Sequence, residues 1–504
     1  MLSRRYQLLL LTVLLLAAFY PTNFAEVNSI DDSALIAWLN SLGNWRLYDV
    51  FFPTVAEGRY YRPLLILTYY LDKEIWSLSA SIMHLENVLL HLVNALLVFT
   101  FARNLLLEEE RQTSFAPLVA ALCFALHPLV VEPVSWISGR SDVLAATFVL
   151  MSANALLKFK LEQKKFYGVL ALISLILGMM SKEVALGFVP GAFLFLIATN
   201  PSQRKLLDAR NKFWTRAKKG GIYLLFGGGA LLVFFTLRSL AFTSNSPRIS
   251  MTLQFMFNDL YHTLFVFLRA FGFYLKKLYW PFPLNFAIIE VDPLYELLAI
   301  PLVLLCFWIA SRRTLISATF ISGLFLIAPA FLIAFGQIAW TPYAERYVYV
   351  ASAFIVIASV YFFREILSKY HYPVAVKFGT FSLILFIGLA TLQRNLVMQT
   401  NLALYTDTVK KSPDFNVAWN QLGIAYYDIN DLKNAELSYR KASSIYSYSY
   451  DEMFDLNLAN ALSEQGKYDE AAAVYAKIFE KEKKSPRAMK HYEEFLQKRN
   501  IQLQ

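Results

Sequence analysis

The feature that most constrains this chain is a series of long apolar runs that recur from the N-terminus to about residue 392. A helix needs about 20 apolar residues to cross the hydrocarbon core of a bilayer. Hydrophobic residues make up 57% of the 504 residues and charged residues only 17%, whereas a soluble domain has about 25% charged residues. We therefore predict a polytopic helical membrane protein, with apolar runs near residues 6–21, 84–106, 115–132, 142–158, 166–181, 183–199, 220–240, 261–279, 297–311, 314–337, 346–363 and 375–392.

The basic residues predict the orientation of these runs, because cytoplasmic loops carry an excess of Lys and Arg. The arginine pair at 4–5 places the N-terminus in the cytoplasm, ahead of a first helix that we expect to stay uncleaved. The basic segments 200–219, 312–313 and 364–377 also fit the cytoplasmic side, provided that one apolar run does not cross. The run 261–279 is the best candidate for a re-entrant or interfacial helix, since it carries three basic residues. About eleven crossings and a C-terminal region outside the cytoplasm follow.

Composition and motifs exclude several other classes of protein. The net charge of +10 comes from Lys and Arg in loops between apolar runs, so it indicates membrane orientation rather than a nucleic-acid partner. Cys123 and Cys306 both lie within apolar runs and predict packing residues, not a disulfide framework. The chain has no Walker loop, no GxGxxG and no Gly-x-Ser-x-Gly elbow, which argues against a nucleotide-driven enzyme or an elbow-type hydrolase.

From about residue 400 a repeat replaces the apolar runs. Residues 419–442 match the spacing W-x2-L-G-x2-Y…A-x3-Y-x2-A of a tetratricopeptide repeat. A later unit places Tyr475 36 residues after Tyr439, which predicts a short insertion within 444–451. The fold class is therefore all-α, with a membrane domain over 1–396 and a C-terminal tetratricopeptide-repeat α-solenoid over 397–504.

Such arrays bind peptides or partner proteins in a concave groove, so we expect a protein or peptide partner there. The predicted groove residues are Trp419, Asn420 and Tyr426. The alternative is a rigid cap that only stabilises the membrane domain.

Two adjacent acids, Asp31 and Asp32, come just after the first apolar run. Carboxylates are costly in hydrocarbon, so this pair should lie at the outer membrane surface or in a polar cavity. One of the two could act as the base that activates an acceptor hydroxyl, while the other orients it or holds a divalent cation such as Mg²⁺ or Mn²⁺. The alternative is a helix cap before Ser33. The sequence assigns no metal ligands and identifies no other cofactor.

More charged side chains converge on the same predicted face. For any single residue, an interhelical ion pair is an equally good interpretation, for example Lys182 with a carboxylate or Glu345 with Arg140. For the whole set we favour an anion site, because arginine suits multidentate phosphate contacts. The predicted phosphate-binding residues are Arg62, Arg140, Lys182 and Arg346, and the acids expected to hold them are Glu132, Asp142, Glu183 and Glu345.

Five stretches, together with the repeats, carry a family resemblance: Tyr61-Arg62-Pro63-Leu64, residues 84–91, residues 127–142, Ser181-Lys182-Glu183 and residues 344–349. On these stretches the chain resembles the GT-C superfamily of polyprenyl-phosphate-sugar-dependent glycosyltransferases. In particular, it is similar to the transmembrane and tetratricopeptide repeat-containing O-mannosyltransferases. The resemblance implies a GT-C fold, a polyprenyl-phosphate sugar donor and inversion at the anomeric carbon. It also implies an acidic base in the first outer loop, residues 21–83, which maps onto Asp31-Asp32.

From these features we expect an enzyme that transfers a sugar to a hydroxyl, such as Ser or Thr of an exported protein. We expect it in a bacterial inner membrane, surrounded by lipid, with its active site and repeats facing the periplasm. The repeat array is shorter than in many relatives, so the acceptor stays open. Two alternatives also stay open: an oligosaccharide ligase or polymerase with a diphosphate-linked donor, and a non-catalytic scaffold that presents the repeats.

Overall fold

The computed structural model describes residues 3–43, 46–52, 60–106, 109–111, 114–198, 221, 227–241, 247–335, 339–368, 373–445, 452–481 and 485–503. The predicted cytoplasmic loop 200–219 and most of the predicted insertion within 444–451 lie outside these residues. The chain divides into two compact units. The first unit comprises Met1–Ala25, Leu35–Leu284 and Glu290–Leu396, and the second comprises Glu26–Ala34, Asn285–Ile289 and Val397–Gln504.

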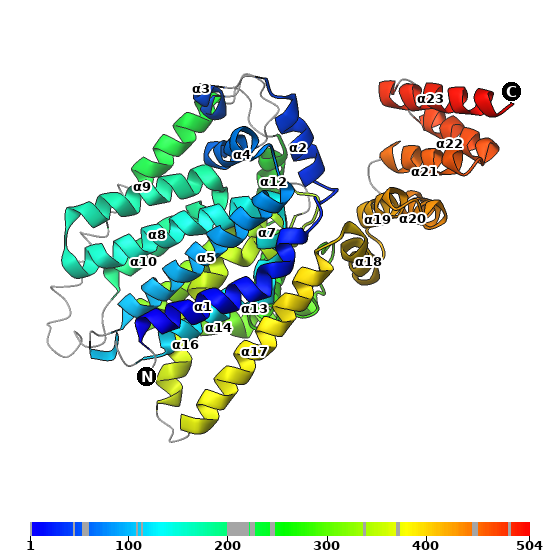
Figure 1. Ribbon diagram of the computed structural model, residues 1–504. Helices are drawn as coiled ribbons and strands as arrows, with labels where there is room; N and C mark the ends of the chain where they lie inside the picture. The colour runs from blue at the N-terminus through cyan, green and yellow to red at the C-terminus, as the bar shows by residue number, and fades with distance from the viewer. Residues whose placement is uncertain are drawn as a thin grey trace. The chain divides into compact units, whose positions relative to one another are not determined.

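The first unit is built from helices of membrane-spanning character (Figure 1). Within the described residues, seven helical segments are long and apolar enough to cross a bilayer, or eight if a pair bent by 48° forms one span. The bent pair consists of α6 (Ala116–Ala125) and the segment Pro128–Ser135, which ends in α7 (Val131–Ser135). The seven segments contain α1 (Arg4–Phe19), α5 (Ala80–Leu105), α8 (Arg140–Glu162), α14 (Leu294–Ser311), α15 (Leu315–Ile333), α16 (Tyr349–Leu367) and α17 (Pro373–Val397).

Three shorter apolar segments complete the set: α9 (Lys165–Ser181), the segment Glu183–Ile197 that includes α10 (Phe188–Ile197), and Gly227–Ala241. All of these segments coincide with apolar runs of the sequence, so the prediction of a helical membrane protein is confirmed. How many of them cross stays a prediction. The amphipathic helix α13 (Leu260–Tyr279) is not among the spanning candidates, and its re-entrant character also stays a prediction.

The outer helices of this unit present large apolar side chains to their surroundings. Phe307 on α14 and Phe378 on α17 are each 70% exposed, and Trp308 and Phe381 are also exposed. In water, contiguous apolar patches of this kind mark a contact with a partner or a membrane. On helices of spanning length they are the surface that faces acyl chains, so this unit is an integral membrane domain.

The interior of this unit is closed by α5, α6, α8 and α16, which pack on one another. A buried polar group links them: His91 Nδ1 lies 2.7 Å from the Tyr349 hydroxyl, and Asn94 Nδ2 donates to the same hydroxyl at 3.1 Å. A buried polar group must find its hydrogen bonds within the protein, since hydrocarbon offers none. The network therefore fixes the relative rotation of α5 and α16, and with it the start of the α16 span.

Among its described residues, the second unit contains six consecutive helices: α18 (Asn401–Lys411), α19 (Asn416–Asp428), α20 (Leu432–Ser444), α21 (Glu452–Glu464), α22 (Tyr468–Lys481) and α23 (Pro486–Leu503) (Figure 1). Neighbouring helices pack as pairs, α19 with α20 and α21 with α22. Gly423 allows the first pair to approach closely, because a Cβ at this position would clash with the ring of Tyr439. Gly466 adopts φ +76° in the turn before α22, a backbone conformation that glycine accepts without strain. Consecutive helix pairs are therefore observed, and a tetratricopeptide repeat stays a prediction.

Candidate active site

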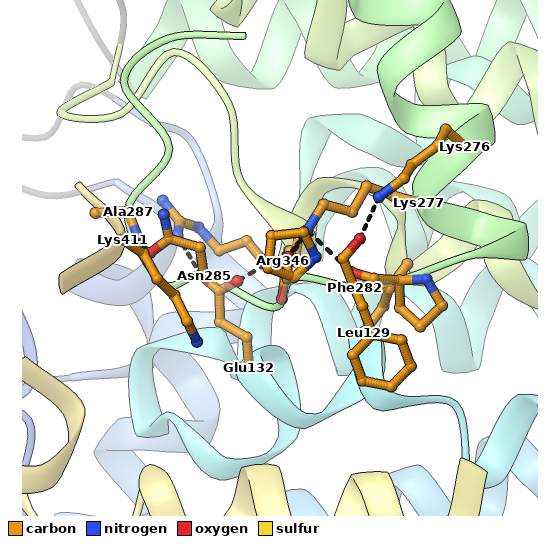
Figure 2. A network of polar contacts seen from close by, with 12 residues as sticks. Leu129, Glu132, Lys276, Lys277, Phe282, Asn285, Ala287, Arg346 and Lys411 are labelled. Atoms are coloured by element: carbon orange, nitrogen blue, oxygen red, sulfur yellow. Dashed lines mark hydrogen bonds and ion pairs between the residues drawn. The ribbon is translucent and has the colours of Figure 1, made fainter. Parts of the chain in front are cut away.

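Arg346 lies in the 3₁₀-helix η7 (Glu345–Val348), at the start of the segment that continues as α16. Its guanidinium pairs with the carboxylate of Glu132, and its backbone N–H donates to the same carboxylate at 3.2 Å (Figure 2). The rings of Trp136, Trp340 and Tyr347 surround the guanidinium carbon, with centroids 5.0, 5.1 and 4.9 Å away. Aromatic faces attract a desolvated cation. Arg346 is thus held in place as a buried positive charge.

Lys277, near the end of α13, makes a second ion pair close to the first. Its Nζ lies 2.6 Å from Glu345 Oε1 and donates to the Pro281 carbonyl at 3.0 Å and to the Pro283 carbonyl. The neighbouring Lys276 donates to the Phe282 carbonyl (Figure 2). Two lysines therefore fix the loop that follows α13, and Lys277 also fixes the residue before Arg346.

Arg62 and Lys182 come from two other turns of the membrane domain. Arg62 precedes α4 (Pro63–Trp76), and its Nη2 lies 2.7 Å from Glu183 Oε2. Lys182 lies between α9 and the 3₁₀-helix η5 (Glu183–Gly187), with its Nζ 2.6 Å from Asp142 Oδ2. The second oxygen of Glu183, Oε1, is buried and makes no hydrogen bond with the described residues.

The electrostatics of Lys182 connect it with two of the other cations, Arg62 and Arg346. The pKa of Lys182 is lowered by burial first; the Asp142 carboxylate opposes this, and the positive charges of Arg62 and Arg346 add to it. Burial would also lower the pKa of Arg62, but the Glu183 carboxylate outweighs burial and raises it. We call Arg62, Lys182, Lys277 and Arg346 the cation cluster. Each member has one carboxylate partner, so an arriving anion can share these cations without leaving an acid unpaired.

Arg140 has a different set of partners from the members of the cation cluster. It is 1% exposed, and its Nη1 lies 2.6 Å from Asp72 Oδ2 while its Nη2 lies 3.0 Å from Glu86 Oε2. Its Nε donates to Asn87 Oδ1 at 2.9 Å, and its Nη2 donates to the Met83 carbonyl at 3.1 Å. At least four of its five N–H groups are therefore used by α4 and α5. The predicted pair between Arg140 and Glu345 is wrong, because Glu345 binds Lys277 instead.

The acids Asp31 and Asp32 belong to the second unit, within Glu26–Ala34. Asp32 is fully buried and starts α2 (Asp32–Ser41), and its Oδ2 accepts the Asn28 N–H at 3.3 Å. The buried Tyr405 hydroxyl donates to Asn28 Oδ1 at 2.9 Å. Burial raises the pKa of Tyr405, the charges of Asp32 and Asp31 raise it further, and its hydrogen bonds oppose this.

The predicted groove residues of the repeat lie in three different settings. Trp419 Nε1 donates to the Pro413 carbonyl at 2.7 Å, and Tyr426 is half-buried. Asn420 is buried and its Oδ1 accepts from Asn457 Nδ2 at 2.9 Å, which links α19 to α21. A small cavity of about 170 Å³ lies further along the array, and none of the three lines it.

No group of three or more His, Cys, Asp or Glu side chains placed to hold a metal ion occurs in the part of the chain that the structure describes.

Sequence reasoning missed several residues of this site. Lys277 was expected only as a charge on a helix that does not cross, and Asp72 and Asn28 carry no motif. One signal could have found Lys277, namely a lysine pair two residues ahead of the Trp280-Pro281-Phe282-Pro283 loop. No local signal marks Asn28 or Tyr405, since their contact joins residues 377 positions apart.

Comparison with known proteins covers part of the membrane domain. Residues 73–219 match the dolichyl-phosphate-mannose-protein mannosyltransferase family. The chain is 37% identical over 93 residues to protein O-mannosyl-transferase TMTC1 of Homo sapiens, which covers 18% of this chain and 10% of that relative. It is 38% identical over 98 residues to TMTC2 of Homo sapiens; the match covers 19% of this chain and 11% of that relative. It is 29% identical over 136 residues to Tmtc1 of Drosophila melanogaster; this match covers 27% of this chain and 15% of that relative.

The matched stretches span only about a tenth to a seventh of these relatives' own lengths. The family match nevertheless includes Glu132, Asp142, Lys182 and Glu183, which hold or form part of the cation cluster. The prediction of a resemblance is confirmed: this chain is similar to the GT-C-type, transmembrane and tetratricopeptide repeat-containing protein O-mannosyltransferases.

Proposed function

We propose that this protein is a membrane glycosyltransferase. It transfers a sugar, mannose by analogy with its relatives, from a polyprenyl-phosphate donor to a Ser or Thr hydroxyl of a protein on the non-cytoplasmic face. The observation that carries the proposal is the cation cluster. Lys277 and Arg346 are buried in it, and Arg62 and Lys182 are partly buried. The charges of Arg62 and Arg346 both act on Lys182. An anionic headgroup on a lipid suits such a site, because its phosphate meets the cations while its tail stays in the bilayer.

The proposed reaction is a single displacement at the anomeric carbon. Asp31 or Asp32 removes the proton from the acceptor hydroxyl, whose oxygen forms the new bond to the anomeric carbon. The bond from that carbon to the phosphate oxygen breaks, and its electron pair leaves with the polyprenyl phosphate. Attack from the face opposite the leaving group inverts the configuration.

The cation cluster would stabilise the charge that develops on the leaving phosphate. Arg346 is the main candidate for contact with the leaving phosphate. Lys182 and Arg62 would assist it, since the charges of Arg62 and Arg346 both act on Lys182. Glu132, Asp142 and Glu183 keep these three cations in place, as their ion pairs indicate. The unpartnered Glu183 Oε1 would accept a hydroxyl of the sugar. The saturated contacts of Arg140 favour the ion-pair interpretation over the donor-phosphate role predicted for it.

Sugar transfer from a polyprenyl-phosphate donor to a Ser/Thr peptide tests the proposal directly. Asp31→Asn and Asp32→Asn should identify the base, since loss of a general base lowers the rate by about 10²- to 10⁴-fold. Asp49→Asn is a matched control from the same predicted outer loop. Asp49 caps a short helix, where it accepts the Arg46 N–H at 2.8 Å and lies 3.6 Å from the Arg46 guanidinium. Full transfer by both single variants and by the double variant would exclude these acids as the base.

Native mass spectrometry of the protein in mild detergent separates the alternatives. A bound monophosphate-linked lipid that is lost in Arg346→Ala supports the glycosyltransferase. A diphosphate-linked oligosaccharide indicates the ligase, and retention of bulk phospholipid alone in both proteins indicates the scaffold.

A further inference from the structure

The short segment that carries Asp31 and Asp32 is tied to the first two helices of the repeat. Asn401, the first residue of α18, donates from Nδ2 to the Val27 carbonyl at 2.9 Å and accepts the Ser29 N–H on Oδ1 at 3.3 Å. Its backbone N–H donates to Glu26 Oε2 at 2.7 Å. On α19, Gln421 Oε1 accepts from the Ser29 hydroxyl at 2.7 Å. One side chain thus contacts both ends of a three-residue stretch just before the acids.

Asn28 transmits this anchoring to the acid pair. Its Oδ1 accepts both the Tyr405 hydroxyl of α18 and the Ile30 N–H, each at 2.9 Å. Its backbone N–H donates to Asp32 Oδ2 at 3.3 Å, and its carbonyl accepts the Ser33 N–H at 3.2 Å. Asn28 is 6% exposed, and Asp32 and Tyr405 are fully buried. These bonds hold the turn from Asn28 to Ser33 in one conformation, set by the position of α18.

We propose that the first two repeat helices, α18 and α19, are part of the reaction centre, where they position the acid pair Asp31-Asp32 through Asn401, Gln421, Tyr405 and Asn28. This role rests on the proposed function of the acids as the base. The repeat then contributes to the rate of the reaction as well as to any choice of acceptor.

The reason is geometric. A catalytic base works only when it is held within about 0.5 Å of its productive position, and a misplacement of about 1 Å can lower a rate about 10²-fold. A loop after a membrane helix has no such rigidity of its own, because its backbone groups need partners outside the loop. In this chain the partners are side chains of α18 and α19, more than 370 residues away in sequence.

The test compares two kinds of measurement on the full-length protein in mild detergent. Asn401→Ala removes the side-chain contacts to Val27 and Ser29, and Tyr405→Phe removes only the hydroxyl that Asn28 accepts. Amide hydrogen exchange followed by mass spectrometry reports the anchoring of residues 26–34 without any reference to activity. Steady-state transfer, with kcat and the donor KM measured separately, reports the positioning.

Tyr475→Phe is the matched control. Tyr475 is also buried in a repeat helix, and its hydroxyl donates at 3.2 Å to Asn460 Oδ1 and to the His491 carbonyl, both within the repeat. Both partners lie outside residues 26–34, so Tyr475→Phe should leave exchange in that segment and kcat as in wild type. Size-exclusion elution and thermal unfolding establish that each variant is folded.

We expect exchange in residues 26–34 to accelerate at least about tenfold in Asn401→Ala and kcat to fall about tenfold, with the donor KM changed less than about twofold. Tyr405→Phe should show smaller changes in the same direction. Unchanged exchange in both variants, or accelerated exchange with unchanged kcat, would overturn the inference. In either case, loss of transfer in Asp31→Asn or Asp32→Asn leaves the proposed function intact. Full transfer in both of those variants instead refutes the base, and the positioning role with it.

Discussion

Replacing Arg140 should destabilise the membrane domain rather than weaken binding of the donor. Arg140→Gln removes the charge that compensates Asp72, whose side chain is 2% exposed. Removal of one partner of a buried ion pair costs about 3–5 kcal/mol, because it leaves an uncompensated buried charge. The pair with Glu86, whose side chain is 31% exposed, adds at most about 1 kcal/mol. We therefore expect Arg140→Gln to lower the free energy of unfolding by about 3–5 kcal/mol.

Unfolding can be followed in mixed micelles by the reactivity of Cys123, which is buried on α6. Adding Asp72→Asn to Arg140→Gln should restore about 1–3 kcal/mol, since it removes the unpaired carboxylate. Arg364→Gln is the matched control: Arg364 and its partner Glu110 are 39% and 41% exposed, so its loss should cost less than about 1 kcal/mol.

The folded fraction of Arg140→Gln should still bind polyprenyl phosphate. If this variant unfolds within about 1 kcal/mol of wild type and selectively loses the lipid, the reasoning from saturated contacts is refuted and Arg140 is a donor-phosphate residue, as the sequence predicted.

Two further predictions concern the cation cluster. Because burial and the charges of Arg62 and Arg346 lower the pKa of Lys182 below the ordinary 10.5, Lys182 loses its proton at a lower pH than a free lysine. Binding of polyprenyl phosphate should therefore weaken as the pH rises through the alkaline range below 10.5. Lys182→Arg should remove this pH dependence. Titration of lipid binding at several pH values measures both effects, and the same affinity of wild type at every pH would contradict the prediction. Arg346→Lys keeps the charge but loses contact with three aromatic rings, so donor affinity should fall about 10- to 100-fold. The same change at the exposed Arg364 should have no effect, and equal affinities of the Arg346→Lys protein and wild type would show that only charge matters.

Much of the membrane domain could be predicted from the sequence because lipid imposes a simple rule. A spanning helix must be long and apolar, so runs such as 84–106 and 346–363 give helices close to their predicted bounds. The sequence also allowed an ion pair between Lys182 and a carboxylate, and the structure shows one with Asp142. The pair of Glu345 with Arg140 is wrong, because the choice between Arg140 and Lys277 depends on which helices are neighbours, and hydropathy does not encode that.

The environment of the acid pair could not be predicted for a related reason. The motif shows two acids after an apolar run, which is a local signal. Their setting depends on Asn28, Asn401 and Tyr405, whose contacts join the two ends of the chain. Side-chain amides such as these carry no periodicity and occur throughout loops and repeat helices. Their role becomes visible only when the fold brings them together.

Two buried arginines, for which the sequence predicted the same role, differ in their contacts. Arg140 donates at least four of its N–H groups to side chains and a carbonyl of α4 and α5. A phosphate could therefore bind it only if those contacts were broken. Arg346 has one close carboxylate, Glu132, and its other contacts, to the hydroxyls of Thr341 and Tyr347, are long at 3.5 and 3.3 Å. Aromatic rings hold its guanidinium without using its hydrogens. A cation held by ring faces keeps its N–H groups available, and for that reason we place the leaving phosphate at Arg346.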